Sequence, residues 1–111
     1  MEVKRGDLFY ADLSVGVGSE QSGIRPVVVI QNDSGNRFST TIIISPLTSS
    51  RKKNIQTHTF IKSRDDLKEN SIALLEQMRT IDKSRLIRKI GELTPLEMER
   101  INKCIRISLG V

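Results

Sequence analysis

Arg25 is the residue whose setting best suits it to chemistry. It stands before the β-branched apolar run at residues 27–30, which predicts a strand buried on both faces. Pro26 fixes its own φ and disfavours a helical conformation at the preceding residue, so Arg25 is expected to lie extended at the mouth of a stiff strand. A cation on a rigid scaffold suits a phosphate site, and the alternative is a solvated charge at a strand end.

Hydroxyl groups at Thr48 and Ser49 follow the next predicted strand. If the two strands pair as neighbours, the start of one lies beside the end of the other, and Arg25 lies near Thr48. An arginine and a hydroxyl can hold a phosphodiester and stabilise charge on its oxygens. Because RNA carries its own nucleophile, the 2′-hydroxyl, this pair fits metal-free cleavage of RNA. It equally fits a module that only binds nucleic acid.

The sequence lacks the pattern of residues that a metal site needs. A zinc site needs closely spaced ligands, and the chain has one histidine, His58, and one cysteine, Cys104. The adjacent carboxylates of Asp65 and Asp66 are interpreted as a solvated charge pair rather than a magnesium site. We therefore expect no bound metal and no cofactor.

Nucleophilic catalysis and phosphate-binding loops are also disfavoured. Cys104 falls beside the apolar face of a predicted helix and His58 within a predicted strand, so both are interpreted as structural. The glycines before Arg25 match neither P-loop nor dinucleotide-binding spacing. Residues 14–23, with three glycines and three serines, predict a flexible loop that leads directly to Arg25.

The composition is that of a small basic protein. The 111 residues are expected to form one domain, 1–111, and Lys plus Arg outnumber Asp plus Glu by 18 to 13, a net charge of +5. This charge favours an anionic partner, such as nucleic acid, an acidic protein segment or a membrane surface. No signal peptide or membrane-spanning apolar stretch is recognised, and a single cysteine fits a reducing compartment, so we expect a cytoplasmic protein.

The remaining pattern predicts a mainly β fold. Strands are expected at residues 8–13, 27–30, 40–45, 57–62, 71–81 and 86–93. Other segments are expected to be turns at 32–36 and 82–85, a basic loop at 51–54, and a charged connector at 63–70 with one helical turn at 65–67. Pro46 is expected to end the third strand. Segment 71–81 could also form a helix, and it is assigned to a strand because Gln77 and Arg79 fall at period two.

The C-terminal segment carries the clearest secondary-structure signal. Thr94 and Glu97 form a capping-box pattern around Pro95, which predicts the start of a helix. Apolar residues then recur at three- and four-residue steps along one face, and Gly110 suits the helix end: Met98, Ile101, Ile105 and Leu109. Short strands closed by one C-terminal helix predict a small, strongly curved antiparallel sheet or a partly open barrel.

Several short motifs occur in a fixed order along nearly the whole chain. They are Lys4-Arg5-Gly6-Asp7, Ala11-Asp12-Leu13, Gly18-Ser19-Glu20-Gln21, the run from Arg25 to Asp33, Leu47-Thr48, and the run from Leu75 to Asp82. A chain with these motifs in this order resembles the MazF/PemK-type toxins of bacterial type II toxin–antitoxin systems. The combination is highly specific, and only residues 49–70 look variable within that family.

The resemblance implies a fold, an activity and partners. The fold is a small SH3-like barrel of the CcdB/PemK-like type, and the protein is a homodimer. The activity is that of a metal-independent, sequence-specific endoribonuclease that cuts single-stranded RNA, typically mRNA, and arrests growth. The cognate antitoxin carries an acidic C-terminal segment that occupies the RNA groove, and a net charge of +5 suits both that segment and RNA.

The resemblance also implies roles for particular residues. Arg25 and Thr48 correspond to the catalytic arginine and threonine of the family. The residues expected to contact RNA are Ser19, Glu20, Gln21, Glu76 and Gln77. Because free arginine titrates too high to be a good general base, Arg25 is expected to stabilise the phosphorane and to protonate the leaving 5′-oxygen. Thr48 is expected to position the phosphate. The base for the 2′-hydroxyl is unassigned, with Glu20 as a candidate. The expected products are a 2′,3′-cyclic phosphate or 3′-phosphate and a 5′-hydroxyl.

Two alternatives keep the barrel and change the function. Gyrase-poisoning toxins of the CcdB type resemble one another in a tryptophan near the C-terminus, and this chain has no tryptophan. A non-catalytic RNA-binding barrel would use an aromatic platform for stacking bases, and this chain has only three Phe and one Tyr. Both alternatives are therefore less favoured than the endoribonuclease.

Overall fold

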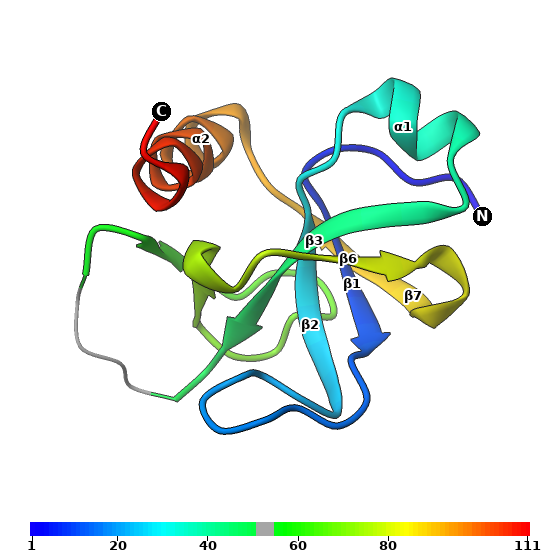
Figure 1. Ribbon diagram of the computed structural model, residues 1–111, viewed down its shortest axis with the longest axis horizontal. Helices are drawn as coiled ribbons and strands as arrows, with labels where there is room; N and C mark the ends of the chain where they lie inside the picture. Colours follow the sequence, from blue (N-terminus) through cyan, green and yellow to red (C-terminus); the bar gives the residue numbers. More distant parts are fainter. Residues whose placement is uncertain (51–54) are drawn as a thin grey trace.

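The computed structural model describes residues 1–50 and 55–111, and Figure 1 shows a strongly curled sheet with a helix beside it. In chain order the elements of these residues are β1 (Asp7–Asp12), β2 (Ile24–Val29), α1 (Asp33–Phe38), β3 (Thr41–Thr48), β4 (His58–Ile61), β5 (Ser71–Leu74), the 3₁₀ turn η1 (Leu75–Gln77), β6 (Arg79–Asp82), the 3₁₀ turn η2 (Lys83–Arg85), β7 (Leu86–Glu92) and α2 (Pro95–Leu109). The basic loop expected at 51–54 lies outside the described residues.

Strand β3 is the centre of the sheet. The strands follow the order β4-β5-β3-β2-β1-β7, every named pair is antiparallel, and β6 pairs with the first half of β3. One edge of β3 therefore contacts β2, whereas its other edge contacts β6 and then β5. The mainly β fold with a C-terminal helix that the sequence predicts is confirmed, as are strands close to the ranges expected for β1, β2, β4 and β7.

The prediction of one strand over 71–81 is wrong. This segment forms β5, then η1, then β6. From the Leu47↔Ala73 pair to the Ile44↔Arg79 pair, β3 changes by three residues while the outer chain advances by six. The three residues of η1 take up this difference, so the turn lets the chain move from one half of β3 to the other. Gln77 and Arg79, whose period-two spacing suggested one strand, lie in η1 and in β6 respectively.

Pro46 does not end its strand as predicted, because β3 continues to Thr48. The outer edge of β3 pairs with β6 up to Ile44 and with β5 from Leu47, and Pro46 falls between the two partners. The carbonyl of Ile43 points to the β2 side, where it accepts from the N–H of Ile30 at 3.0 Å. Backbone groups alternate sides along a strand, so position 46 points to the outer edge, where the missing N–H of proline removes no ladder hydrogen bond.

Two connecting segments also differ from the predictions. Residues 32–36, predicted as a turn, begin helix α1, because the Asn32 side chain accepts from Gly35 N–H at 2.8 Å and caps the helix. The buried Asn36 amide donates to the Gln31 carbonyl at 2.9 Å and fastens the helix to the end of β2. The helical turn expected at 65–67 is instead a tight turn, with Asp65 at a φ of 46°. Asn and Asp side chains serve turns and helix caps alike, so their presence did not distinguish the two.

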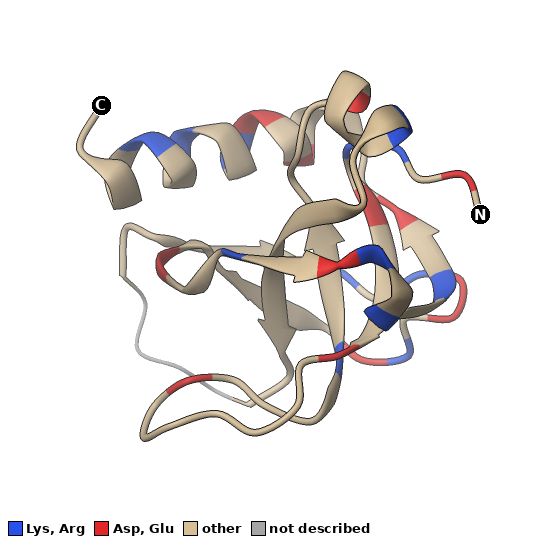
Figure 2. Cartoon of the chain, turned by 45° about the vertical axis from the view of Figure 1, so that its right-hand side comes forward, with Lys and Arg blue, Asp and Glu red and all other residues tan. Residues whose placement is uncertain are grey.

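Helix α2 begins and ends where its signals predict. Thr94 and Glu97 form the capping box, and Gly110 ends the helix at a φ of 73°. Ile101 is fully buried, and Met98 and Ile105 pack against the same core cluster. Leu109, predicted on the same face, is 61 % exposed because the helix extends past the edge of the sheet. Figure 2 shows acidic residues in the N-terminal part of α2 and basic residues beyond, which complements the helix dipole.

The core is divided between the two faces of the curled sheet. Adjacent residues of a strand point to opposite faces, so Leu8 and Val28 belong to the cluster under α2, whereas Phe9 and Val27 belong to the cluster on the other face. Cys104 is buried in the α2 cluster as predicted, and burial raises the pKa of its thiol. Within the described ranges, no helix is long and apolar enough to cross a membrane.

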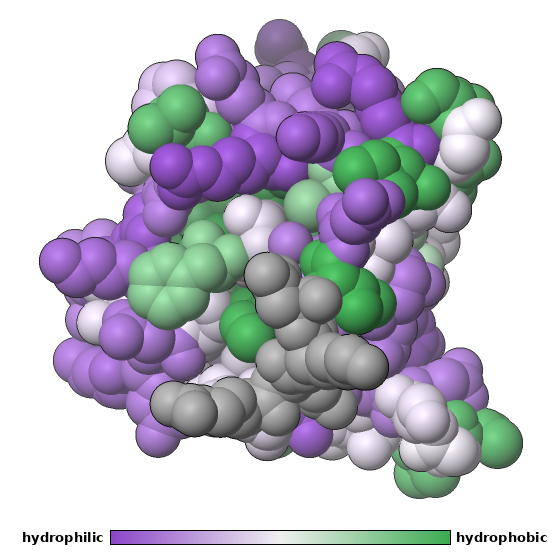
Figure 3. Space-filling view, turned by 90° about the vertical axis from the view of Figure 1, so that its left-hand side faces the viewer, coloured by the Kyte–Doolittle hydropathy of each residue, from purple (hydrophilic) through white to green (hydrophobic). Residues whose placement is uncertain are grey.

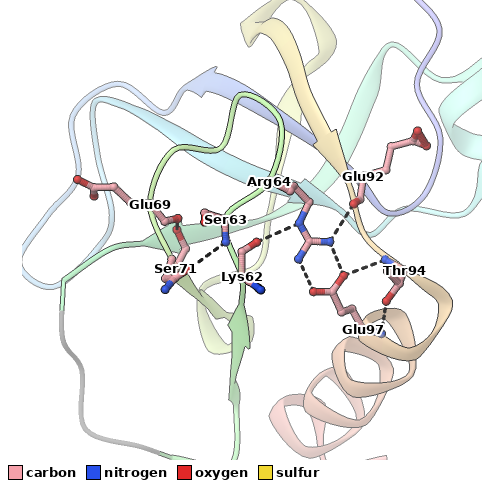
Figure 4. A network of polar contacts seen from close by, with 9 residues as sticks. Lys62, Ser63, Arg64, Glu69, Ser71, Glu92, Thr94 and Glu97 are labelled. Atoms are coloured by element: carbon pink, nitrogen blue, oxygen red, sulfur yellow. Dashed lines mark hydrogen bonds and ion pairs between the residues drawn. The ribbon is translucent and has the colours of Figure 1, made fainter.

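An ion pair fastens the 63–70 connector to α2 (Figure 4). The guanidinium of Arg64 donates to both carboxylate oxygens of Glu97 at 2.5 Å and to the Glu92 carbonyl at 3.1 Å. Glu97 also accepts from Thr94 N–H at 2.9 Å as part of the capping box. The hydrogen bonds from Arg64 lower the pKa of Glu97, and those to Glu97 raise the pKa of Arg64. The connector is therefore held in place by the first turn of the helix.

Candidate active site

Arg25 and Thr48 are brought to the same end of the sheet, as the sequence predicts. β2 pairs with β3 through Val27↔Pro46, and continuing that antiparallel register by two residues on each strand sets Arg25 opposite Thr48. Arg25 is half-buried, and its Nε donates to the Ser22 carbonyl at 2.8 Å. Thr48 is buried, and its Oγ1 accepts from Ser50 N–H at 3.2 Å. Each side chain is thus fixed by a local backbone contact.

A pocket of about 240 Å³ opens beside the Arg25 side chain. The sheet contributes Tyr10, Pro26 and Leu47 to its floor, and Ser49 stands at the end of β3. The connector contributes Leu67, Lys68 and Glu69 to the pocket, and Ser71 at the start of β5 completes its lining. The clamp between Arg64 and Glu97 holds this connector, so α2 contributes indirectly to the shape of the arginine pocket.

A second hollow, which we name the loop groove, lies between residues 14–23 and η1. Its volume is about 440 Å³. It brings together four of the five residues predicted to contact RNA, together with Pro46 and other neighbours: Glu20, Gln21, Glu76 and Gln77. Ser19 is joined to this set through its carbonyl, which accepts from Gln77 Nε2 at 3.3 Å. These residues are distant in sequence, and the loop and η1 bring them to one surface.

Two of the side chains predicted to contact RNA, Glu20 and Gln77, form hydrogen bonds with backbone groups of the 14–23 loop. Gln77 Oε1 accepts from Gln21 N–H at 2.8 Å, so the Gln77 amide spans two loop positions. Glu20 Oε1 accepts from Val17 N–H at 2.7 Å within the loop. This arrangement preorganises the backbone of a segment whose glycines give it little stiffness of its own.

Glu76 is bound to β4. Its carboxylate lies 2.9 Å from His58 Nε2 and accepts from the Thr57 hydroxyl at 3.0 Å. Burial by itself would raise the pKa of Glu76, but the hydrogen bonds from His58, from its own backbone N–H and from Thr57 outweigh burial and lower it. Glu76 is therefore a carboxylate at neutral pH, and it lines the loop groove while it is bonded to a strand behind it.

Sequence reasoning assigned no role to Arg79 or Tyr10. Arg79 lines the loop groove, and its Nη1 donates to the Leu13 carbonyl at 3.4 Å. Tyr10 lines the arginine pocket, with the Arg88 guanidinium 5.1 Å from its ring centre. The alternation of β1 could have indicated which face Tyr10 occupies, but the cross-strand neighbours depend on tertiary pairing. Across residues 1–50 and 55–111, no three His, Cys, Asp or Glu side chains come together as metal ligands would.

Comparison with known proteins identifies the family of this chain. Residues 4–109 match the family described as PemK-like, MazF-like toxin of type II toxin–antitoxin system. The chain is 50 % identical to Endoribonuclease MazF of Staphylococcus saprophyticus, with 98 % of this chain and 92 % of the relative covered. It is also 50 % identical to Endoribonuclease EndoA of Bacillus subtilis, with 100 % and 97 % covered. Both relatives are endoribonucleases, the enzyme class predicted from the sequence.

A solved structure from a mycobacterial species, an endoribonuclease in complex with its cognate antitoxin, gives a TM-score of 0.82 at 26 % identity. The comparison covers 98 % of this chain and 96 % of that one. The small-barrel fold expected from the resemblance is thereby confirmed. The match over residues 4–109 and the two relatives at 50 % identity make the conclusion plain: the chain belongs to the PemK-like, MazF-like toxin family of type II toxin–antitoxin systems.

Proposed function

We propose that this toxin is a metal-independent endoribonuclease that cuts single-stranded RNA, typically mRNA, where Arg25 and Thr48 meet. One observation carries the proposal: the β2–β3 register sets a half-buried arginine opposite a buried threonine, with a pocket beside the arginine. RNA then lies across this end of the sheet with its bases in the loop groove. Cutting mRNA inhibits translation and arrests growth.

The reaction uses the nucleophile that RNA supplies. The 2′-oxygen attacks phosphorus, the bond to the 5′-oxygen breaks, and the products are a 2′,3′-cyclic phosphate, or a 3′-phosphate after hydrolysis, and a 5′-hydroxyl. Arg25 stabilises the charge on the phosphorane and gives a proton to the leaving 5′-oxygen. Thr48 Oγ1 already accepts a hydrogen bond from Ser50, so its own O–H is available to donate to a phosphate oxygen. Glu20 is the candidate base, and its Oε1 is already engaged by Val17 N–H.

Recognition of the RNA sequence is assigned to the loop groove. Ser19, Glu20 and Gln21 present backbone and side-chain groups from the 14–23 loop, and Glu76 and Gln77 present theirs from η1. Polar groups of this kind read the exposed edges of unpaired bases, which is how proteins recognise single-stranded RNA.

The same surface suits the proposed antitoxin. An acidic C-terminal segment would compete with RNA for Arg25 and its surroundings, and the net charge of +5 favours both ligands. We also propose that the toxin works in the cytoplasm, where mRNA and an antitoxin made alongside it are found.

A homodimer is proposed for this toxin, with its contact on the face where α2 crosses β4. A groove of about 400 Å³ runs between the two elements, and Figure 3 shows apolar residues around a hollow on this side. Ile55 and Phe60 are 44 % and 56 % exposed, and Ile107 is 38 % exposed. Large apolar side chains gathered on one face favour association.

Cleavage of a long RNA in excess EDTA tests the proposal. The purified protein should yield discrete fragments with 5′-hydroxyl ends. Arg25→Ala should lower the rate by about 10³-fold, because it removes the main donor to the developing charge. Arg25→Lys, which keeps the charge and loses the two-pronged geometry, should fall between them. No cleavage by the wild-type protein at any enzyme excess would contradict the proposal.

A further inference from the structure

The turn η1 is held by two sets of side-chain hydrogen bonds, one to the β4 region and one to the 14–23 loop. On one side Glu76 is bonded to Nε2 of His58, the first residue of β4, at 2.9 Å and to the hydroxyl of the preceding Thr57 at 3.0 Å. On the other side Gln77 accepts from Gln21 N–H at 2.8 Å and donates to the Ser19 carbonyl at 3.3 Å. A continuous chain of contacts therefore runs from β4 through η1 to the 14–23 loop.

The β4 end of this chain is rigid. The side chain of His58 is only 8 % exposed, and its residue pairs with Leu74, which leads directly into η1. Leu75 N–H donates to the Thr57 carbonyl at 3.0 Å, and the Cys104 thiol of α2 contacts the His58 carbonyl at 3.6 Å. His58 is thus held between a strand partner and the helix, and it is a fixed point from which Glu76 can be oriented.

The two segments beyond His58 have little order of their own. η1 is a three-residue 3₁₀ turn preceded by Leu74, whose side chain cannot cap it, and such turns depend on outside contacts. The 14–23 loop contains Gly18 and Gly23 at φ values of 58° and 73°, and its glycines make the unbound backbone costly to order. The buried Leu75 side chain holds η1 to the core, and backbone hydrogen bonds such as Gly23 N–H to the Ser14 carbonyl at 2.7 Å close the base of the loop. The side-chain hydrogen bonds of Glu76 and Gln77 add the direct link between β4, η1 and the loop.

We propose that His58 is a positioning residue for recognition of single-stranded RNA: it fixes Glu76 and thereby the turn from which Gln77 holds the 14–23 loop in shape. The inference rests on the proposed function and assigns Glu76 and Gln77 a supporting part in it. The contacts that Glu76 and Gln77 make with β4 and the loop set the shape of the loop groove in which the bases are read. His58 affects binding and sequence choice, and Arg25 performs the chemistry.

Matched variants separate this role from a structural one. His58→Leu removes the donor to Glu76, whereas His58→Gln keeps an N–H that can reach the carboxylate. Gln77→Ala breaks the other end of the chain, and Thr59→Ala is the control in the same strand. Each protein is assayed for kcat and KM on one cleavable RNA, and its cut sites on a long RNA pool are sequenced from their 5′-hydroxyl ends. Thermal unfolding is recorded for each.

His58→Leu and Gln77→Ala should each raise KM about tenfold and broaden the set of cut sequences, with kcat changed less than about threefold. A tenfold rise corresponds to about 1.4 kcal/mol, which is the strength of one hydrogen bond of this kind. The double variant should resemble either single variant, because both break the same chain of contacts. His58→Gln and Thr59→Ala should keep the wild-type KM and cut sites.

Unchanged KM and cut sites in Gln77→Ala or in folded His58→Leu would overturn the inference, as would additive effects in the double variant. If His58→Leu does not fold, Gln77→Ala and the pair Glu76→Gln and Glu76→Ala decide the matter. Glu76→Gln retains an acceptor and should stay near wild type, whereas Glu76→Ala should behave as Gln77→Ala. The proposed function is tested separately, by the loss of about 10³-fold in cleavage rate expected for Arg25→Ala.

Discussion

Arg25 is oriented by its immediate neighbours in the chain. Pro26 holds the backbone extended, and the Ser22 carbonyl accepts the Nε hydrogen, so the guanidinium is fixed before any ligand arrives. Thr48 has the complementary property: its oxygen is already an acceptor for Ser50 N–H, which orients the free hydroxyl hydrogen. Two side chains with such restricted choices lose little entropy when a phosphate binds, which is what preorganised catalysis requires.

Substitutions at Thr48 test the role of the hydroxyl. Thr48→Val keeps the shape and removes the hydroxyl proposed as a donor to the phosphate, so kcat on RNA should fall about 100-fold. Thr48→Ser keeps the hydroxyl and should retain most of the rate. Single-turnover cleavage with saturating enzyme measures both. Equal rates for Thr48→Val and wild type would remove the threonine from the mechanism.

At the scale of elements, the sequence predicted features that depend on neighbouring residues better than contacts between distant residues. Helix α2 could be predicted because its capping box lies within four residues, and Arg25 because Pro26 follows it directly. The contacts of Gln77 could not be predicted, because its partner Ser19 is 58 residues away. Whether the two residues meet depends on where η1 interrupts the segment 71–81. The continuation of β3 past Pro46 could not be predicted either. The proline is acceptable there because β3 changes its partner strand from β6 to β5 at that point.

The clamp between the connector and α2 gives a pH-dependent stability. The folded pKa of Glu97 lies below its ordinary value of 4.5, so its contribution is present above that value and is lost as the pH falls through the folded pKa. Glu97→Gln should lower the free energy of unfolding at pH 7 by roughly 2–3 kcal/mol, since it breaks a mostly buried ion pair. The difference from wild type should shrink below about pH 4.5.

Urea unfolding at a series of pH values measures the Glu97 effect. Glu99→Gln, an exposed change in the same helix, is the control and should stay close to wild type. A Glu97→Gln deficit that is constant from pH 7 to pH 3 would show that the clamp does not depend on the carboxylate charge.

At the scale of the whole molecule, two surfaces are assigned different work. The end of the sheet with Arg25 and the loop groove faces RNA in the proposed function. The α2–β4 face, proposed as the dimer contact, exposes Ile55, Phe60 and Ile107 beside the polar side chains that also line its groove (Figure 3). His58 and its contacts lie between the two, because the histidine lines the α2–β4 groove while its partner Glu76 lines the loop groove.

Ile107→Lys tests the proposed homodimer. A charge in the apolar contact should leave a folded monomer, detected as a fall in molar mass by light scattering after gel filtration towards the chain mass of 12.5 kDa. Leu96→Lys, an exposed apolar position at the other end of α2, is the control and should remain dimeric. A wild-type protein that already elutes at the mass of one chain would contradict the dimer.

The pairing of β1 with β7 has a consequence for when the toxin becomes active. Asp7 near the start of the chain pairs with Glu92 near its end, so the first strand finds its outer neighbour only after almost the whole sequence has been made. Gln77 also reaches back to a loop near the start of the chain. A nascent chain therefore lacks the complete sheet until β7 has been made, and long-range pairing of this kind is slow. In the proposed function, the mRNA that encodes this toxin therefore meets a fully folded enzyme only after β7 has been made.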